Sequence, residues 1–260
     1  YPALHAKMLN TIGRLNWLLS DFLEAQSVLD EARAIWNRPG VEGERGLAEA
    51  LSFLGLVAYS SKKDLKTAQP LFEESLELYQ KHEDQWGIAF DIFQLGMLAT
   101  RKDDSSALAL LEQSMDLFHQ LGDIWGRSRA SHMLGEFFLR QGDYNKARHF
   151  FEQNLRFDEE LKFKPGMVVA LSNLGELHLH QKEYEQAKQY FEKSLDVSHT
   201  YGIKETWGFG LYLLGMVALH QNEYSFARRY FTDHFKSENA SFDKVSAGIL
   251  FLSQAAVSAG

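Results

Sequence analysis

The sequence predicts an all-α fold, a right-handed α-solenoid in which antiparallel helix pairs are stacked one after another. The main observation is a glycine that recurs along the 260 residues in steps of 39 to 42. The glycines are Gly13, Gly55, Gly96, Gly135, Gly175 and Gly215. Apolar residues around them have a helical period, and turn-forming residues separate the helical stretches. A fixed period of this length indicates a stacked array of repeats.

The first helix of each repeat surrounds the recurring glycine. Leu171, Leu174, Gly175 and His178 are spaced i, i+3, i+4 and i+7, which places them on one face of a helix. In four repeats a second glycine precedes the first by nine residues and indicates where this helix begins. These glycines are Gly46, Gly87, Gly126 and Gly166.

The second helix has a different template, in which Tyr184, Ala187 and Phe191 recur with their equivalents. Glycine within a helix costs about 1 kcal/mol relative to alanine, so the repeated glycine needs a compensating contact. We expect Gly175 to let Ala187 of the second helix approach the first helix closely. Pro70 lies near the start of one second helix, where it is expected to kink that helix or delay its onset.

The repeat places six units at about 3–38, 43–82, 86–122, 125–163, 165–202 and 204–239. A terminal helix over about 242–259 opens a seventh unit or caps the array. Together they form a single solenoid over 1–260. Because the chain starts Tyr1-Pro2-Ala3 and begins and ends inside repeats, we expect it to be a fragment of a longer protein.

The Leu-Gly, aromatic-x-x-Ala and Phe positions resemble the tetratricopeptide repeat, in a form of about 40 residues rather than 34. The resemblance covers nearly the whole chain. It implies a curved array whose first helices line a concave face, which suits an extended peptide or a helix. Lys7 and Asn10 lie on the first unit, but later units lack the partners typical of repeats that hold a peptide C-terminus.

Composition excludes several classes of function. The net charge of -8 argues against binding nucleic acid or anionic membranes without sequence preference. No apolar run approaches ~18 residues, so no membrane span is expected. The absence of cysteine excludes disulfides, thiolate metal sites and cysteine nucleophiles, and fits the cytoplasm.

Positions -3, +1, +4 and +5 from the glycine are predicted to face the groove, with -6 at its edge. The candidate binding residues are Asn10, Arg14, Phe90, Phe93, Met97, Arg101, Arg129, His132, Glu136, Arg140, Ser172, Glu176, His180, Phe209, Tyr212, Met216 and His220.

The candidates form two apolar patches and a basic column. Phe90, Phe93 and Met97 make the patch of the third unit, and the other patch lies on the sixth. Arg101, Arg140, His180 and His220 form the column, which is either a solvated edge or a grip for a carboxylate. Likewise, the patches either bind a ligand or are covered by neighbouring helices.

Catalytic and metal sites are not expected. His178 and His180 point about 200° apart on a helix and cannot chelate one ion, whereas His180 and His220 are equivalent and could share one. No phosphate-binding or hydrolase motif is present. We therefore expect neither catalysis nor a cofactor.

Two functions fit these observations. The first is a scaffold that binds a protein or peptide, with contacts between solenoid ends as a route to homo-oligomers. The second is the sensor region of a larger regulator, since Leu121-Gly122-Asp123 with Gly126 is similar to arrays in maltose-activator-like transcription regulators and related signal-transduction ATPases. Peptide-pheromone receptors that use similar arrays are a third alternative.

Overall fold

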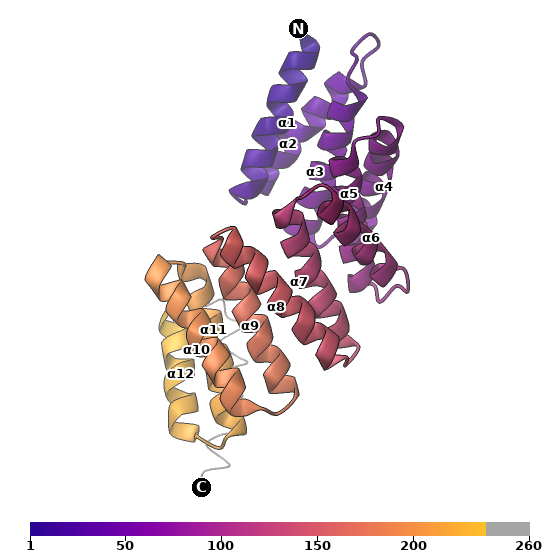
Figure 1. The fold of residues 1–260 in the computed structure, drawn as a ribbon. Helices are drawn as coiled ribbons and strands as arrows, with labels where there is room; N and C mark the ends of the chain where they lie inside the picture. Colours follow the sequence, from indigo (N-terminus) through magenta and orange to yellow (C-terminus); the bar gives the residue numbers. More distant parts are fainter. Residues whose placement is uncertain (238–260) are drawn as a thin grey trace. The chain divides into compact units, whose positions relative to one another are not determined.

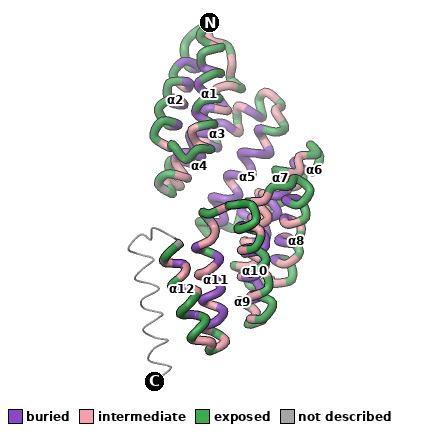
Figure 2. Tube along the Cα trace, turned by 90° about the vertical axis from the view of Figure 1, so that its left-hand side faces the viewer, coloured by how far each residue is buried: buried purple, intermediate pink, exposed green. Residues whose placement is uncertain are grey.

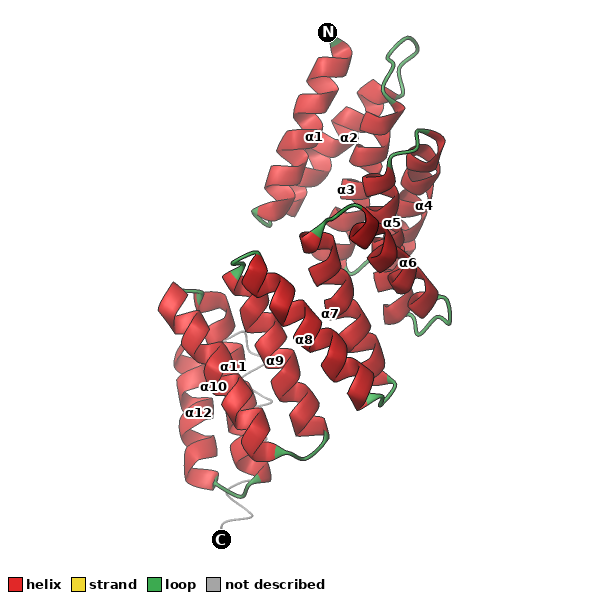
Figure 3. Ribbon diagram, in the orientation of Figure 1, coloured by secondary structure: helices red, strands yellow, loops and turns green. Residues whose placement is uncertain are grey.

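The computed structural model describes residues 1–237, and the helix predicted over 242–259 lies outside them. Within these residues, twelve α-helices and one short 3-10 helix, Lys204–Thr206, are joined by short loops (Figures 1 and 3). The α-helices are α1 Pro2–Leu18, α2 Phe22–Trp36, α3 Glu44–Lys62, α4 Leu65–Lys81, α5 Gln85–Arg101, α6 Ala107–Gln120, α7 Ile124–Arg140, α8 Tyr144–Glu160, α9 Lys164–His180, α10 Tyr184–Tyr201, α11 Trp207–His220 and α12 Tyr224–Ser237. The predicted all-α class is confirmed.

The helices form two compact bodies. The N-terminal body comprises Tyr1–Ala130 and the C-terminal body begins at Ser131. Each odd-numbered helix is the first helix of a repeat and each even-numbered helix is the second. That all repeats form one continuous array stays a prediction.

Aspartates set the start of many helices. The side chains of Asp64, Asp84, Asp123 and Asp143 each accept a hydrogen bond from the backbone N–H three residues later, at 3.0 to 3.1 Å. Such caps satisfy donors that the first helical turn leaves unpaired. The capping aspartates therefore fix the residue at which each of these helices begins.

The mid-helix glycine makes room for an aromatic ring, which corrects the expected contact with alanine. A Cβ on Gly175 would lie 2.3 Å from the Phe191 ring, and one on Gly135 would lie 2.4 Å from the Phe151 ring. Both rings are fully buried. Ala187 is also fully buried, but the atoms nearest Gly175 belong to Phe191. The glycine therefore pairs with the phenylalanine one turn beyond the alanine.

In the four first helices that have an earlier glycine, this glycine faces the preceding repeat. A Cβ on Gly46 would lie 2.3 Å from Trp36, and one on Gly87 would lie 2.4 Å from Tyr79. Trp36 is the last residue of α2, and Tyr79 lies in the last turn of α4, so each belongs to the repeat before. Bulky residues thus fit into notches on the next helix, which fixes the spacing between neighbouring repeats.

Hydrogen bonds between the two helices of a repeat reinforce this packing. Ser75 donates to the Ala48 carbonyl at 2.8 Å, and Ser194 donates to the Val168 carbonyl at 3.0 Å. His234 contacts the Gly208 carbonyl at 2.8 Å in the same way. Each acceptor lies seven residues before the recurring glycine of its repeat. This hydrogen bond between the two helices is therefore a repeated feature.

Pro70 does not delay the onset of its helix. α4 starts at Leu65 and continues through Pro70 to Lys81. The cap from Asp64 and the buried contacts of Phe72 hold this helix, although proline lacks an N–H to donate. Figure 2 shows burial concentrated on first helices such as α5, with second helices more exposed.

The glycine–aromatic contact predicts unequal effects of alanine at two equivalent positions. A Cβ at Gly55 would meet the buried Phe72 ring at 2.7 Å, whereas at Gly96 the nearest atoms, of leucines, lie at 3.0 Å or beyond. Overpacking costs about 1–3 kcal/mol, and alanine gains about 1 kcal/mol in a helix. Gly55→Ala should therefore lower the urea midpoint, while Gly96→Ala should leave it nearly unchanged. Equal effects would contradict this account.

Candidate functional site

A groove of about 650 Å³ crosses the first helices of the N-terminal body. Its walls come from α1, α3, α5 and the first part of α7, with Tyr79 added from α4. The lining residues are Lys7, Thr11, Arg14, Trp17, Leu18, Arg45, Gly46, Glu49, Ser52, Phe53, Tyr79, Asp84, Trp86, Phe90, Gln94, Trp125 and Arg129. Side chains from successive repeats thus meet in one cavity.

Aromatic rings form a continuous series along the groove. Trp17 meets Phe53 edge to face at 6.0 Å between ring centroids, and Phe53 lies 6.2 Å from Phe90. Phe90 then stacks on Trp86 at 5.0 Å. Phe53 and Phe90 are buried, whereas Trp86 is 44% exposed. The series therefore has a buried floor and an accessible rim, as apolar ligand sites do.

Charged side chains are held around these rings. Arg14 pairs with Glu49 at 3.7 Å. The Arg129 guanidinium lies 4.9 Å from the Trp125 ring and 5.4 Å from the Phe93 ring, within cation–π range. The aromatic faces thus position a cation at the groove.

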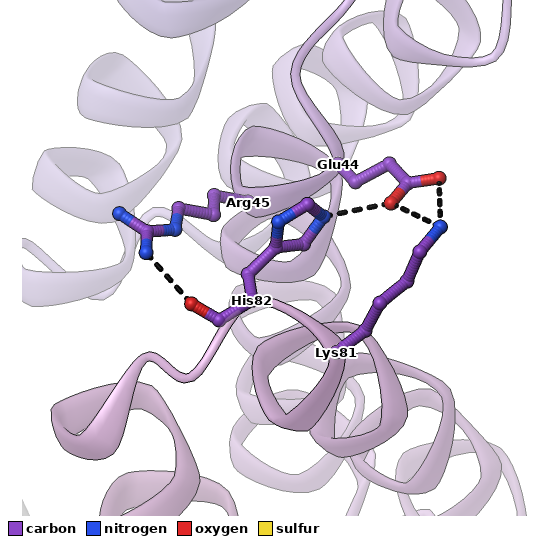
Figure 4. Close-up of polar contacts among 4 residues, drawn as sticks. All are labelled: Glu44, Arg45, Lys81 and His82. Carbon is purple, nitrogen blue, oxygen red and sulfur yellow. Dashed lines mark hydrogen bonds and ion pairs between the residues drawn. The ribbon is translucent and has the colours of Figure 1, made fainter.

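A polar cluster at the start of α3 holds Arg45 (Figure 4). Glu44 binds Lys81 at 2.6 Å and His82 at 2.7 Å, joining α3 to the end of α4. The Lys81 and His82 hydrogen bonds lower the pKa of Glu44. Arg45 donates to the His82 carbonyl at 2.7 Å. The cluster therefore fixes the backbone from which Arg45 reaches the groove.

Much of the groove lining comes from two repeat positions, -6 and -10, which lie outside the central positions predicted to face it. Position -6 was expected at the edge, yet Lys7, Glu49, Phe90 and Arg129 all line the groove there. Position -10 supplies further lining residues. These are Arg45, Trp86 and Trp125. The non-repeating character of these two positions was the available signal.

Gln94 is an unusual member of the lining. It is 1% exposed, and its side-chain oxygen Oε1 has no hydrogen-bond partner among residues 1–237. Leaving a buried acceptor unpaired costs about 1–3 kcal/mol. A ligand N–H in the groove is a group that would satisfy it.

A buried acid, Asp91, lies where α5 packs against α3. Asp91 occupies a position that is Ala50 in the repeat before and Ala170 in a later one. Ser52 donates to Asp91, and Ser52 also contacts Ser75 at 2.9 Å. Burial raises the pKa of Asp91 to about 7, opposed by its serine hydrogen bonds. The two serine hydrogens cannot serve all three contacts, counting the one from Ser75 to the Ala48 carbonyl. A protonated Asp91 can instead donate to Ser52, which frees the Ser52 hydrogen for Ser75, and every contact then has a hydrogen.

The structure divides the candidate residues of the N-terminal body. Arg14, Phe90 and Arg129 line the groove. In contrast, Asn10, Phe93 and Met97 are buried and lie outside the groove lining. For Phe93 and Met97 this agrees with the alternative that neighbouring helices cover the patch. Asn10 instead binds the Gly46 carbonyl at 2.7 Å, because position -3 turns toward the next helix. Arg101 is exposed and outside the groove lining.

In the C-terminal body, the central candidates form a polar group. His132 pairs with Glu136 at 3.3 Å, and both are half-buried. Burial raises the pKa of Glu176, and the negative charge of Glu136 adds to this while His180 opposes it. Ser172 is buried against Ser194 at 2.9 Å, so it supports the repeat rather than offering surface.

The histidines of the predicted basic column stack on tyrosines. His220 lies 5.3 Å from Tyr184 with nearly parallel rings, and His180 lies 6.5 Å from Tyr144. Each tyrosine begins the second helix of the preceding repeat, so this edge joins repeats. Arg140 is exposed.

The apolar patch of the sixth repeat is partly covered. Tyr212 and Met216 are half-buried and pack against the cluster around Phe231. Phe209 is exposed. The expected patch is thus reduced mainly to Phe209.

Within residues 1–237, no group of three or more His, Asp or Glu side chains is arranged to hold a metal ion. The helices described in the same range are also too short or too polar to span a bilayer.

The buried acid predicts a pH-dependent stability. The folded pKa of Asp91 exceeds its ordinary value, so the folded chain binds the proton more tightly and loses stability as pH rises from about 4 to above 7. Asp91→Asn should remove this slope and raise the urea midpoint at pH 8. The exposed Asp116 is the matched control, and Asp116→Asn should leave the slope in place. A slope that survives in Asp91→Asn would contradict the assignment.

Solved structures share this fold. A signal transduction ATPase with numerous domains and a tetratricopeptide repeat sensor, from Pyrococcus horikoshii, has a TM-score of 0.75 and 17% identity, over 97% of this chain and 38% of that one. A Rap protein complexed with competence and sporulation factor has a TM-score of 0.73 and 16% identity, over 98% of this chain and 76% of that one. NprR, a quorum sensor from B. thuringiensis, in complex with its cognate peptide NprX, has a TM-score of 0.68 and 14% identity, over 96% of this chain and 71% of that one. At these identities the likeness shows the fold.

No curated protein matches the chain in sequence. The family model described as tetratricopeptide repeat matches residues 4–81, 126–200 and 166–236, which together are well over half of the chain. With its repeated glycine–aromatic contacts, the chain therefore belongs to the tetratricopeptide repeat family.

Proposed function

We propose that the chain is a non-enzymatic scaffold that binds a peptide or protein segment in the groove of its N-terminal body. The observation that carries this proposal is the groove itself, which first helices of successive repeats line with side chains that differ between repeats. The repeated positions hold the fold, so these variable positions are available for recognition.

The relatives of similar fold support a peptide ligand. A Rap protein forms a complex with competence and sporulation factor, and NprR forms one with its cognate peptide NprX. The absence of cysteine supports the cytoplasm as the proposed compartment. Exposed Leu4, Met8 and Leu15 on α1 support end contacts between copies.

A second candidate is the sensor region of a larger signalling protein. The chain spans 38% of the signal transduction ATPase whose tetratricopeptide repeats act as a sensor. Under this candidate the same groove receives the signal, and an attached domain responds to it. Joining the chain to its neighbouring domains and measuring ATP hydrolysis or DNA binding with groove ligand present distinguishes the two candidates.

Selection from a random twelve-residue peptide library displayed on phage tests the binding function. The wild-type chain should enrich a family of related peptides. The double variant Trp86→Ala, Trp125→Ala should lose that enrichment, because both rings form the accessible rim.

Phe226→Ala is the matched control, since Phe226 is 52% exposed and lies in the C-terminal body. It should enrich the same peptides as the wild type, and circular dichroism should show all three proteins equally folded. Enrichment that the double variant retains would overturn the groove as the binding site.

A further inference from the structure

We infer that the groove of the N-terminal body recognises a short acidic peptide segment with large apolar side chains, and that Gln94 accepts a hydrogen bond from its backbone. This inference rests on the proposed function and specifies its ligand. Three independent features of the groove carry it, which are its aromatic walls, its charge and its unpaired acceptor.

The aromatic walls select apolar side chains. Trp86 and Trp125 are 44% and 39% exposed, so each offers part of a ring to a ligand. The buried rings of Phe53 and Phe90 form the floor of the groove. Burying apolar ligand surface against these rings is the main source of affinity.

The charge of the groove selects carboxylates. Four cationic side chains and two acidic ones line it, so the cations exceed the acids by two. The chain as a whole has the opposite balance, with 27 Lys and Arg against 35 Asp and Glu. Basic residues are therefore concentrated where a ligand would lie, which favours an acidic partner.

The two acids are already engaged by the protein. Glu49 accepts from Asn10 at 3.2 Å and pairs with Arg14. Asp84 caps α5 through the Gly87 N–H. The Lys7 side chain, by contrast, is exposed and forms no ion pair or hydrogen bond within residues 1–237. Lys7 is thus the cation of the groove that is open to a ligand carboxylate.

Gln94 provides the third feature. Its Oε1 is buried in the groove wall without a donor, and each N–H of an extended peptide backbone is such a donor. A free carboxylate or an apolar small molecule lacks this group. The unpaired acceptor therefore favours a peptide.

The size of the groove limits the ligand to a short segment. Its volume of about 650 Å³ lies within the range of about 300–1,000 Å³ that is typical of sites for compact ligands. A few residues of an extended chain fit this space, whereas a whole helix does not.

Fluorescence anisotropy with labelled synthetic peptides tests the ligand chemistry. The probe is a ten-residue peptide that alternates glutamate with leucine and phenylalanine. One comparison peptide has lysine for glutamate, and another has serine for the apolar residues. The acidic apolar peptide should bind at least ten times more tightly than either, and its affinity should fall with added salt. Equal or better binding of the lysine peptide overturns the inference.

Charge variants locate the interaction. Lys7→Glu should weaken binding of the acidic probe about fivefold or more. Lys66→Glu is the matched control, because it changes the net charge equally on α4 and Lys66 is outside the groove lining. Equal effects of the two variants overturn the assignment of the acidic residues to the groove.

Gln94→Met separates recognition from packing. Methionine fills a similar volume without a polar oxygen, so the thermal midpoint should stay the same or rise while affinity for the probe falls about 3- to 10-fold. A lower midpoint with unchanged affinity gives Gln94 a purely structural role and overturns its part in the inference.

The library selection separates this inference from the proposed function. If the enriched peptides are basic or polar and their enrichment depends on Trp86 and Trp125, the proposed binding function stands and the acidic apolar ligand is overturned. If the Trp86→Ala, Trp125→Ala variant enriches the same peptides as the wild type, both the groove as the binding site and the acidic apolar ligand are overturned. A labelled single-stranded ten-thymidine oligonucleotide is the alternative polyanion, and groove-dependent binding of it in preference to the acidic peptide overturns the peptide assignment.

Discussion

The contact between a helix-interior glycine and a buried ring or leucine is the constraint on which this fold depends. In the second repeat, Gly55 leaves space that the Phe72 ring fills, and the equivalent contact recurs along the chain. It lets two helices approach closely without a void, and close packing is where such small helical units gain stability. A second set of glycine contacts, such as that of Gly87 with Tyr79, packs each repeat closely against the next in the same way.

This packing leaves one side of the first helices outside the repeat pattern. The residues there need not match between repeats, so they differ in size and charge. In the N-terminal body they bring Trp17, Trp86 and Trp125 to the same groove as four basic side chains. The repeated packing contacts and the proposed binding groove thus lie on different faces of the same helices.

Much of the fold could be predicted from the sequence because its determinants are local. The glycine period, the helical spacing and the capping aspartates each involve residues a few positions apart. The error about Gly175 arose because alanine and phenylalanine of the same template, Ala187 and Phe191, both lie on the buried face, and only the crossing of the helices decides which meets the glycine.

The binding face was harder to predict for a related reason. Position -6 lines the groove and position -3 is mostly buried, and this depends on how each first helix is rotated against its neighbours. The Ser52–Asp91 contact joins residues 39 apart in sequence, across two repeats. No periodic pattern predicts such a contact, since the equivalent of Asp91 in the other repeats is uncharged, such as Met8, Ala50 or Gly210.

Asp91 and Gln94 also bear on how this chain would respond to engineering. Both place polar atoms where the fold would be more stable without them. A consensus design that averaged the repeats would replace Asp91 with alanine and select against an orphaned amide. The resulting protein would have a higher thermal midpoint. Its stability would depend less on pH, and its groove would lack the acceptor proposed to bind a peptide backbone.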